Sequence, residues 1–382
     1  MKIACVYINA GKGHFIPAKS IADAMVEKGL EIELVDFFDI IKDYGLDMLN
    51  QKIWQIQLKH PKLEIFINGT TDKNGRTMNL LVPFFIKRYK KDFLQWLELH
   101  KPDAFISTHY FPSRLIPEIL DDCGLEIPSF AYASDVFFTP TSGLTNKLRK
   151  FYISTLEGQQ HVLAKQLVPE KVELTTFPIQ TGCVSAARVS KAQAREKLSL
   201  QNKFTLVINL GGEGIGTTRL IKKLDKLELE MQVMVLGGMD EKSRELFRVI
   251  GAQLKYVNLT IAGFVSNVYD YVLASDVVAG KAGINTMVEA AYFKRPFLIT
   301  GLYYTVLAAA DFYERHKIGW LALDVDSQVD IIARCMREPD ILLQMEDNFK
   351  IVPITYGASA IADSIIKEVM SISGGSISRV LS

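Results

Sequence analysis

Residues 263–296 read GFVSNVYDYVLASDVVAGKAGINTMVEAAYFKRP. The apolar run VVAG is typical of a buried strand, and a helix is expected over 283–292, directly after the small residues of KAGINT. Backbone N–H groups at such a helix start are free to bind a diphosphate, and the helix dipole favours the anion. Glu289, deeper on this helix, can accept hydrogen bonds from a ribose diol. The alternative is ordinary capping by Asn285 or Thr286, with Glu289 as a surface residue.

Strand-like and helix-like segments alternate along the rest of the chain, as expected for parallel sheets covered by helices. Strands are predicted at 2–9, 32–38, 104–108, 128–134, 150–154 and 172–176, and again at 204–210, 231–237, 259–264, 277–281, 296–300 and 320–324. Helices are predicted at 17–28, 84–99, 113–121, 156–167, 217–226, 240–252, 283–292 and 308–316. The pattern predicts an α/β fold of two doubly wound, Rossmann-like domains, with a ligand in the interdomain cleft beyond the carboxyl ends of the strands.

The polar stretch FPIQTGCVSAARVS, residues 177–190, is the predicted domain connection, because proline and glycine interrupt it. It gives an N-terminal domain over 1–182 and a C-terminal domain over 190–356. The remaining tail, about 357–382, begins with the apolar-periodic helix ASAIADSIIKEVM, which we expect to pack back on the N-terminal domain. The final SISGGSISRVLS is expected to fray.

Composition narrows the possible classes of protein. The 382 residues are 48% hydrophobic, enough for two cores, and 44 basic against 43 acidic residues argue against a nucleic-acid binder. Four cysteines without a CxxC pair disfavour metal and disulfide frameworks and favour a reducing cytoplasm. The chain begins with the strand-like MKIACVYI rather than a secretory signal, and its longest uncharged apolar stretch, 296–310, is too short to span a bilayer. We therefore expect a cytoplasmic protein, peripheral at most at a membrane.

Two glycine-rich loops follow predicted strands. NAGKGHFIPA, residues 9–18, contains Gly11, Gly13 and His14, and these residues alone leave open whether the loop binds a phosphate or carries out proton transfer. GGEGIGTT, residues 211–218, can admit a diphosphate or a sugar close to the backbone, or it can simply form a tight turn.

These motifs, in this order, resemble the GT-B glycosyltransferases of the monogalactosyldiacylglycerol synthase and processive diacylglycerol glucosyltransferase group, which is related to the peptidoglycan N-acetylglucosaminyltransferase. The group pattern G-[YF]-V followed by K-P-G-G-x-T-x-x-E-A stands here as GFV and KAGINTMVEA. NAGKGHFIPAKSIADAM resembles the group's GxGHxxAAxAI loop and places His14 on the family histidine. HKPDAFISTH, which ends at His109, and IPSFAYASDVF, which places Asp135 on the family aspartate, resemble two further segments.

The resemblance implies an inverting enzyme that moves a sugar from a UDP-sugar to a diacylglycerol-like lipid hydroxyl, with no bound metal and no cofactor beyond the UDP-sugar co-substrate. His14 would be the base, Asp135 would orient it or act as the base itself, and Gly11, Gly13 and His109 would shape the acceptor loop. The donor-binding candidates are Gly211, Gly212, Glu213, Gly237, Phe264, Val265, Lys281, Ala282, Gly283, Asn285, Thr286 and Glu289. Among these, the backbone at Phe264 and Val265 would hold the uracil nucleobase, and Glu289 would hold the ribose.

Two departures from the family pattern keep other functions open. Ile284 replaces the second glycine of KPGG, and YTVLAAAD, residues 304–311, stands where a P-G-Q-E-x-x-N segment is expected, without its glutamine–glutamate pair. One alternative is a catalytically degenerate GT-B protein that binds a nucleotide or a lipid. Another is a UDP-sugar epimerase or hydrolase of the same architecture. A nicotinamide oxidoreductase is disfavoured, because neither half has a GxGxxG turn with a ribose carboxylate at the usual offset.

Residues 42–99 combine apolar residues with a basic run that includes Lys87, Arg88, Lys90 and Lys91. This mixture suits a helix at an anionic membrane surface, and relatives in the resembled group use this region at membranes. The alternative is an excursion packed on the N-terminal domain with a solvated basic edge.

Overall fold

The computed structural model describes residues 1–382 except 10–11, 74–75, 166, 211–215 and 381–382. Contacts divide the chain into two compact units. Unit 1 contains residues 1–180, 303–305 and 353–382, and unit 2 contains 181–302 and 306–352. The first crossing between the units lies at Gln180–Thr181, within the stretch expected to connect the two domains.

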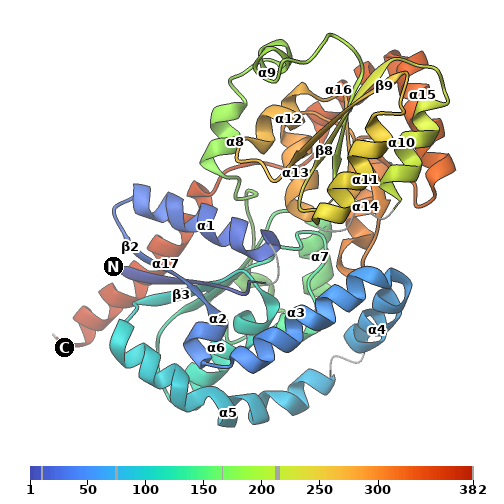
Figure 1. The fold of residues 1–382 in the computed structure, drawn as a ribbon. Coiled ribbons are helices and arrows are strands. Elements are labelled where there is room, and N and C mark those ends of the chain that lie inside the picture. Colours follow the sequence, from blue (N-terminus) through green and yellow to red (C-terminus); the bar gives the residue numbers. More distant parts are fainter. Residues whose placement is uncertain (10–11, 74–75, 166, 211–215, 381–382) are drawn as a thin grey trace. The chain divides into compact units, whose positions relative to one another are not determined.

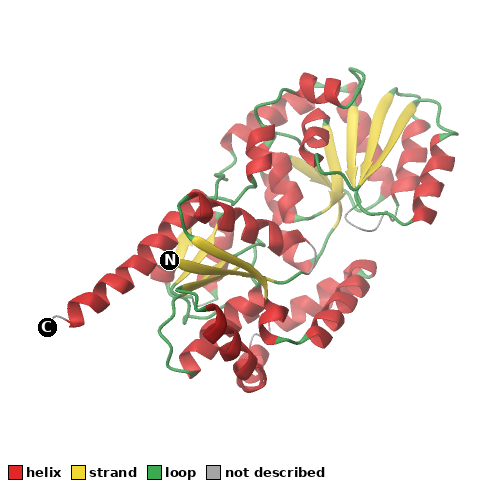
Figure 2. Cartoon of the chain, turned by 60° about the vertical axis from the view of Figure 1, so that its left-hand side comes forward, coloured by secondary structure: helices red, strands yellow, loops and turns green. Residues whose placement is uncertain are grey.

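The sheet of unit 1 has six parallel strands. These are β1 (Lys2–Tyr7), β2 (Glu31–Asp36), β3 (Ala104–Ser107), β4 (Ser129–Tyr132), β5 (Lys150–Ile153) and β6 (Val172–Leu174), in the order β2-β1-β3-β4-β5-β6. The strands are short, and the central strands β3 and β4 are buried along their whole length, as expected for a parallel sheet that helices cover on both faces (Figure 2).

The helices of unit 1 are α1 (Lys12–Glu27), α2 (Phe37–Ile41), α3 (Tyr44–Lys59), α4 (Pro61–Lys73), α5 (Arg76–His100), α6 (Tyr110–Asp122), α7 (Leu156–Ala164) and α17 (Ser359–Val380). Fully buried aromatic side chains, among them Phe37, Phe93 and Phe105, form the core between α5, α6 and the sheet. The C-terminal helix α17 lies beside α1 (Figure 1), where Lys28 pairs with Asp363 at 2.7 Å.

Unit 2 repeats this architecture. Its strands are β7 (Thr205–Asn209), β8 (Met231–Leu236), β9 (Val257–Gly263), β10 (Val277–Lys281), β11 (Phe297–Gly301) and β12 (Gly319–Leu321), all parallel, in the order β12-β11-β10-β7-β8-β9. Its helices are α8 (Thr181–Ala186), α9 (Lys191–Lys197), α10 (Thr217–Asp225), α11 (Glu241–Gly251), α12 (Val268–Ala274), α13 (Ile284–Tyr292), α14 (Leu307–Arg315), α15 (Val325–Arg337) and α16 (Asp340–Ile351).

Each sheet has one point at which the strand order reverses. In unit 1 this point lies between β1 and β3, and in unit 2 it lies between β10 and β7. Successive helices pack on opposite faces at such a point, so a crevice opens beyond the carboxyl ends of the two strands, where ligands of these folds bind. Helix α1, which carries His14 in its first turn, follows β1, and the loop before α13 follows β10. The two motifs singled out in the sequence therefore lie at the two switch points.

The predicted fold class and all twelve predicted strands are confirmed, although Phe37 and Phe38 belong to α2 rather than to a strand. Three helices begin earlier than predicted, because α1, α5 and α6 continue toward the N-terminus past Pro17, Pro83 and Pro112. The stretch 177–190, in which the crossing between the units lies, is less polar than expected, because it contains α8 and the buried side chains of Phe177, Ile179 and Cys183. The expected fraying at the end was also wrong, since α17 continues to Val380.

Candidate functional site

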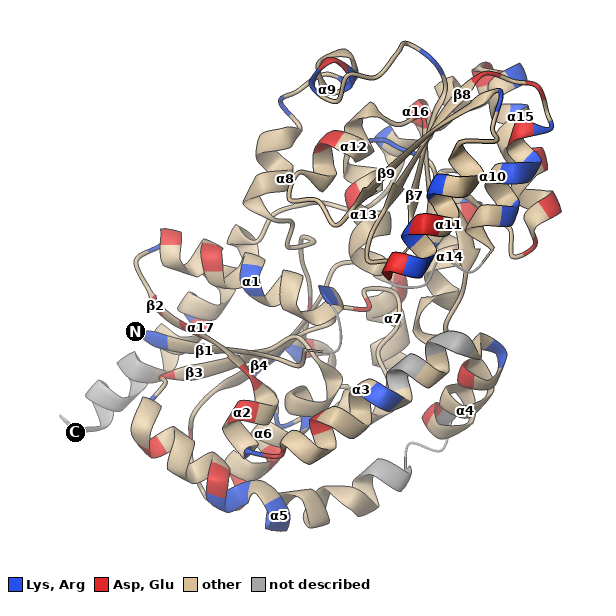
Figure 3. Cartoon of the chain, in the orientation of Figure 1, with Lys and Arg blue, Asp and Glu red and all other residues tan. Residues whose placement is uncertain are grey.

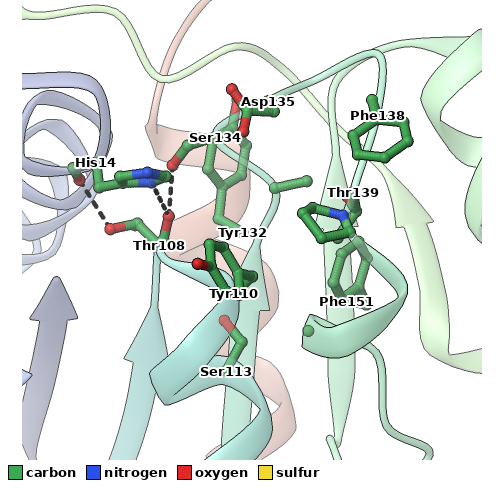
Figure 4. Close-up of a pocket in the computed structure, with 13 residues that line it drawn as sticks. His14, Thr108, Tyr110, Ser113, Tyr132, Ser134, Asp135, Phe138, Thr139 and Phe151 are labelled. Atoms are coloured by element: carbon green, nitrogen blue, oxygen red, sulfur yellow. Dashed lines mark hydrogen bonds between the residues drawn. The ribbon is translucent and has the colours of Figure 1, made fainter. Parts of the chain in front are cut away.

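At the switch point of unit 1, His14 lies in the first turn of α1, not in a loop as its glycine-rich context suggested. Its Nδ1 lies 2.8 Å from the carbonyl oxygen of Thr108, which follows β3. The Thr108 hydroxyl donates back to the His14 carbonyl at 2.8 Å. These two hydrogen bonds join α1 to the end of β3 and fix the imidazole ring (Figure 4).

The bond to Thr108 also fixes the tautomer of His14. A carbonyl oxygen only accepts, so Nδ1 carries the proton and Nε2 keeps its lone pair. Burial lowers the pKa of His14 to about 4, although the Thr108 carbonyl acts in the opposite direction. At neutral pH the imidazole is therefore uncharged and can accept a proton at Nε2, which is the state that a general base requires.

His109 is the N-cap of α6, and its Nδ1 accepts the N–H of Phe111 at 3.1 Å. Its ring meets the ring of His14 edge to face, with the centroids 4.4 Å apart. Burial, and then the neighbouring charge of His14, lower the pKa of His109 well below its usual range. His109 therefore caps the N-terminus of α6, and its neutral ring packs against the ring of His14 and supports its position.

Asp135 lines the same pocket as His14, together with Tyr110, Tyr132 and Phe138 (Figure 4). Burial raises the pKa of Asp135 to about 7. The Thr108 carbonyl holds Nδ1 of His14, and it also accepts the Ser134 hydroxyl at 2.6 Å. The orienting role expected for Asp135 thus belongs to Thr108 in this structure. The pocket encloses ≈ 20 Å³, the space of about one water molecule, so a hydroxyl fits beside these groups without rearrangement.

At the switch point of unit 2, β10 ends at Lys281 and α13 begins after Gly283. The N-cap Gly283 has φ −120° and ψ 116°, and no side chain caps the helix. A helix start that no side chain caps is a common position for a ligand anion. Ala282 is fixed at the sheet edge, where its N–H donates to the carbonyl of Gly301 at 2.9 Å.

Ile284 does not obstruct this helix start. Its side chain is only 6% exposed and belongs to the core side of α13, as does Asn285 at 8%. The bulky residue that replaces the family glycine therefore points inward, and Thr286 remains partly exposed in the first turn. The alternative of capping by Asn285 or Thr286 was wrong, because the N-cap is Gly283 and no side chain caps α13.

Glu289 is partly buried on α13, where the hydroxyl of Tyr269 on α12 donates to its Oε1 at 3.4 Å. Burial raises the pKa of Glu289 to about 7, against the lowering effect of the Tyr269 bond. The carboxyl group is thus held in a setting where two further hydroxyl donors would favour its ionised form.

The ends of β8 and β9 carry the residues expected at the nucleobase. Gly237, at φ 105°, donates its N–H to the carbonyl of Gly263 at 2.8 Å. Phe264 follows with a side chain that is 81% exposed, and Val265 is partly exposed. The Phe264 ring covers Gly238 so closely that an added Cβ there would lie 2.7 Å from the ring.

Four expected site residues, Gly11, Gly211, Gly212 and Glu213, lie outside the described residues. Gly13 is exposed in the first turn of α1, with open space where a Cβ would stand, and Lys281 is partly exposed at the end of β10. The sequence reasoning missed Thr108 and Tyr269, which position His14 and Glu289. The only signal for Thr108 was its place next to His109 in the segment HKPDAFISTH.

The described residues contain no group of three or more His, Cys, Asp or Glu side chains that could hold a metal ion. Among the helices as far as they are described, none combines the length and apolarity needed to cross a bilayer.

No protein-family model matches the chain. It is similar to three kinds of curated glycosyltransferase. The UDP-N-acetylglucosamine--N-acetylmuramyl-(pentapeptide) pyrophosphoryl-undecaprenol N-acetylglucosamine transferase of Clostridium botulinum is 24% identical over 294 residues, which cover 76% of this chain and 75% of the relative. The probable monogalactosyldiacylglycerol synthase 2 of Oryza sativa subsp. japonica is 21% identical, covering 86% and 70%. The processive diacylglycerol beta-glucosyltransferase of Bacillus cytotoxicus is 22% identical, covering 96% and 94%.

Solved structures share the fold at low identity. MurG of Acinetobacter baumannii has a TM-score of 0.65 at 13% identity, over 96% of this chain and 99% of that chain. The UDP-GlcNAc 2-epimerase from Neisseria meningitidis, bound to UDP-GlcNAc, has a TM-score of 0.63 at 10% identity, over 97% and 100%. The GT-B fold and the resemblance to the lipid glycosyltransferase group are confirmed.

Proposed function

We propose that this chain, a GT-B relative of the lipid glycosyltransferases, transfers a sugar from a UDP-sugar to the hydroxyl of a diacylglycerol-like lipid, with inversion. The observation that carries the proposal is the state of His14. Its Nδ1–H donates to the Thr108 carbonyl, which leaves Nε2 unprotonated. The ring lies at the switch point of unit 1 and lines a pocket that admits a hydroxyl.

In the proposed step, Nε2 of His14 takes the proton of the acceptor hydroxyl as its oxygen attacks the anomeric carbon. The new bond joins the acceptor oxygen to that carbon on the face opposite UDP. The bond from the anomeric carbon to the diphosphate breaks, and UDP leaves with the electron pair. One displacement inverts the anomeric centre. Asp135, with a pKa raised to about 7, is the second candidate for the base.

In unit 2, the N–H groups that begin α13 are proposed to bind the diphosphate, and Glu289 the ribose hydroxyls. A helix N-terminus stabilises a nearby anion by ~0.3–2 kcal/mol, and more negative charge develops on the diphosphate as UDP leaves. We propose that this helix, rather than a metal ion, neutralises the leaving group. Transfer should then proceed at an undiminished rate in excess EDTA, and loss of activity with recovery on adding Mg²⁺ would contradict it.

The acceptor is proposed to reach unit 1 from a membrane surface. Apolar side chains lie exposed on one face of α3 (Leu49, Ile53, Ile56) and of α4 (Leu63, Phe66, Ile67), and charged residues of both signs also occur along these helices (Figure 3). We name these six residues the apolar face. Exposed apolar patches of this kind mark membrane or protein contacts. Of the basic run on α5, Arg88 and Lys90 are already paired with Asp43 and Asp122, so apolar burial is the main contribution we propose.

Co-sedimentation with vesicles tests the membrane contact. Phe66, 71% exposed, is the best single site, because its loss removes apolar area without touching the core. Phe66→Ser should weaken binding to vesicles of phosphatidylglycerol and diacylglycerol several-fold. The matched control is Leu246→Ser, which removes an exposed apolar side chain from α11 of unit 2. Equal vesicle binding by both variants and the unchanged protein would contradict the proposed surface.

The function itself is tested by transfer. The protein is incubated with UDP-glucose, UDP-galactose or UDP-N-acetylglucosamine and diacylglycerol vesicles, and glycolipid is detected by mass spectrometry. Lipid-dependent glycolipid formation from one donor is expected. Consumption of a UDP-sugar without acceptor would instead favour an epimerase or hydrolase. Tight UDP binding with no turnover on any lipid would favour the degenerate alternative.

A further inference from the structure

The hydroxyl of Thr139 is a buried polar group that the proposed mechanism does not use. Thr139 is 6% exposed and lines the same pocket of unit 1 as His14 and Asp135. Its Oγ1 is buried and has no hydrogen-bond partner among the described residues. Buried hydroxyl groups are nearly always hydrogen-bonded, because an unpaired one has lost its bonds to water without a replacement. The Thr139 hydroxyl therefore indicates a ligand that supplies the missing partner.

The chain around Thr139 is held from two sides. Nε2 of His161 on α7 lies 3.1 Å from the carbonyl oxygen of Thr139, and this nitrogen donates because a carbonyl oxygen only accepts. Asp72 on α4 accepts the N–H of Thr141 at 2.6 Å. The ring of Phe138 packs against the ring of His161, with the centroids 4.6 Å apart. Threonine, branched at Cβ, also has few side-chain rotamers, so the hydroxyl is positioned before a ligand binds.

The other buried hydroxyl groups that line this pocket are already engaged. Their hydrogen bonds join Ser113 to the His109 carbonyl at 2.8 Å, Ser134 to the Thr108 carbonyl at 2.6 Å, Thr108 to the His14 carbonyl at 2.8 Å and Tyr132 to Ser154 at 2.9 Å. Tyr110 also lines the pocket, but it is 38% exposed. Among the described lining residues, Thr139 therefore carries the remaining buried hydroxyl donor.

A diacylglycerol-like acceptor has a group that matches such a donor. Its free hydroxyl both donates and accepts, and His14 is the proposed partner for the hydroxyl proton. Its ester carbonyl oxygens can only accept, so they need a donor from the protein. Thr139 lies across the pocket from His14 (Figure 4). The glycerol backbone likewise separates the free hydroxyl of the lipid from its nearest ester carbonyl.

We propose that Thr139 determines specificity for an ester-linked acceptor, because its hydroxyl donates to the carbonyl oxygen of the ester beside the hydroxyl that is glycosylated. The inference rests on the proposed function and names the class of lipid that the same pocket takes. An ether-linked lipid has no carbonyl oxygen at this position, so the Thr139 hydroxyl stays unpaired in its complex. A site with a buried donor discriminates in this way against a ligand that lacks the matching acceptor.

Transfer to two acceptors tests the inference. Dioleoylglycerol and its dialkyl ether analogue, which has the same chains and the same free hydroxyl, are presented in vesicles with the preferred UDP-sugar. The unchanged protein should prefer the ester in kcat/KM by about three- to tenfold, the contribution of one neutral hydrogen bond. Thr139→Val keeps the shape of the side chain without the hydroxyl, so its ester-to-ether ratio should fall to about one, through a higher KM for the ester. Thr139→Ser keeps the hydroxyl and should keep most of the preference.

Thr145→Val is the matched control. Thr145 is also 6% exposed, but its hydroxyl donates to Glu118 at 3.1 Å and accepts the N–H of Lys147 at 3.2 Å. Thr145→Val should therefore lower the midpoint of thermal unfolding and leave the ester-to-ether ratio unchanged. Thr139→Val should leave the midpoint unchanged or raise it, because it removes an unpaired buried hydroxyl.

The outcomes separate this inference from the proposed function. If the unchanged protein glycosylates neither lipid, the proposed function fails and the inference fails with it. If both lipids are glycosylated and Thr139→Val keeps the ester-to-ether ratio of the unchanged protein, the inference alone fails. It also fails if Thr139→Val lowers the unfolding midpoint as much as Thr145→Val does, since the hydroxyl would then already have a partner within the protein.

Discussion

Replacement of His14 by alanine separates chemistry from binding. The Nε2 of His14 is the proposed base, and the proposed donor site lies on other residues, in unit 2. A positioned general base contributes typically 10²–10⁴-fold, so kcat of His14→Ala should fall by about that factor. The Kd for UDP should stay within about twofold of the unchanged protein.

The cost in stability is small enough to keep the variant folded. The substitution removes the hydrogen bond to Thr108, about 1 kcal/mol, and the edge-to-face contact with His109, about 0.5–1.5 kcal/mol. The Thr108 carbonyl is not left without a donor, because the Ser134 hydroxyl still donates to it at 2.6 Å. The sum, about 1.5–2.5 kcal/mol, lies well below the 5–15 kcal/mol that is usual for a folded domain.

His100→Ala is the matched control. His100 stacks on Trp96 at 4.3 Å and bonds to Glu33 at 2.5 Å, so its loss removes a ring contact and a hydrogen bond elsewhere in unit 1. Initial rates of glycolipid formation, UDP calorimetry and thermal unfolding are measured for both variants. Loss of UDP binding in His14→Ala, or an equal loss of kcat in His100→Ala, would refute the role of His14 as base.

Three further predictions concern proton transfer, the ribose site and the sheet of unit 2. With His14 as the base, kcat/KM for the acceptor, measured at saturating UDP-sugar so that Glu289 is already occupied, should be independent of pH between about 6 and 8, because the pKa of His14 is lowered to about 4. A rise with pH that is half complete near 7 under these conditions would assign the base to Asp135 instead. UDP binding at pH 7 should release about half a proton, because ribose hydroxyls that donate to Glu289 lower the raised pKa of its carboxyl group. Calorimetry in buffers of different ionisation enthalpy measures the number of protons released. No release, or proton uptake by the protein, would contradict the role of Glu289 at the ribose. Gly280→Ala should lower the free energy of unfolding by about 1–3 kcal/mol, because the new Cβ would lie 2.7 Å from the carbonyl oxygen of Asn209 on the neighbouring strand. Gly283→Ala, whose Cβ would have its nearest neighbour at 4.0 Å, should change the free energy of unfolding by less than about 0.5 kcal/mol. Denaturant melts that show equal losses for the two variants would overturn this packing argument.

Most strands could be predicted from the sequence because they are short runs rich in β-branched and aromatic residues, and the central ones, such as β3, β4 and β8, are buried along their whole length. The starts of three helices could not be predicted correctly, and the reason is the same for each. Proline favours the first turn of a helix, so Pro17, Pro83 and Pro112 suggested starts at or just after them. The helices extend past Pro17 and Pro83 because tertiary packing outweighs the lost hydrogen bond, whereas Pro112 lies in the first turn of α6, where no intrahelical hydrogen bond is lost. His14 is therefore in the first turn of α1 rather than in a loop.

The candidate site could be predicted where a residue type carries the chemistry itself. His14 and Glu289 stand in distinctive patterns and lie at switch points or on the helices that follow them. Their partners could not be predicted, because Thr108 acts through a backbone carbonyl, which any residue possesses, and Tyr269 comes from a separate helix. The hydrogen bonds that hold the chain at Thr139 and Thr141 join positions 22 and 69 residues apart, and no local pattern in one sequence reports such a pairing.

The central claim is that the start of α13 holds the diphosphate of a uridine nucleotide, and a crystal structure of the UDP complex tests it most directly. The account predicts diphosphate oxygens within hydrogen-bonding distance of the backbone amides of Ile284, Asn285 and Thr286, with the ribose hydroxyls on the carboxylate of Glu289. A nucleotide bound elsewhere on unit 2, with no contact to these amides, would contradict the claim.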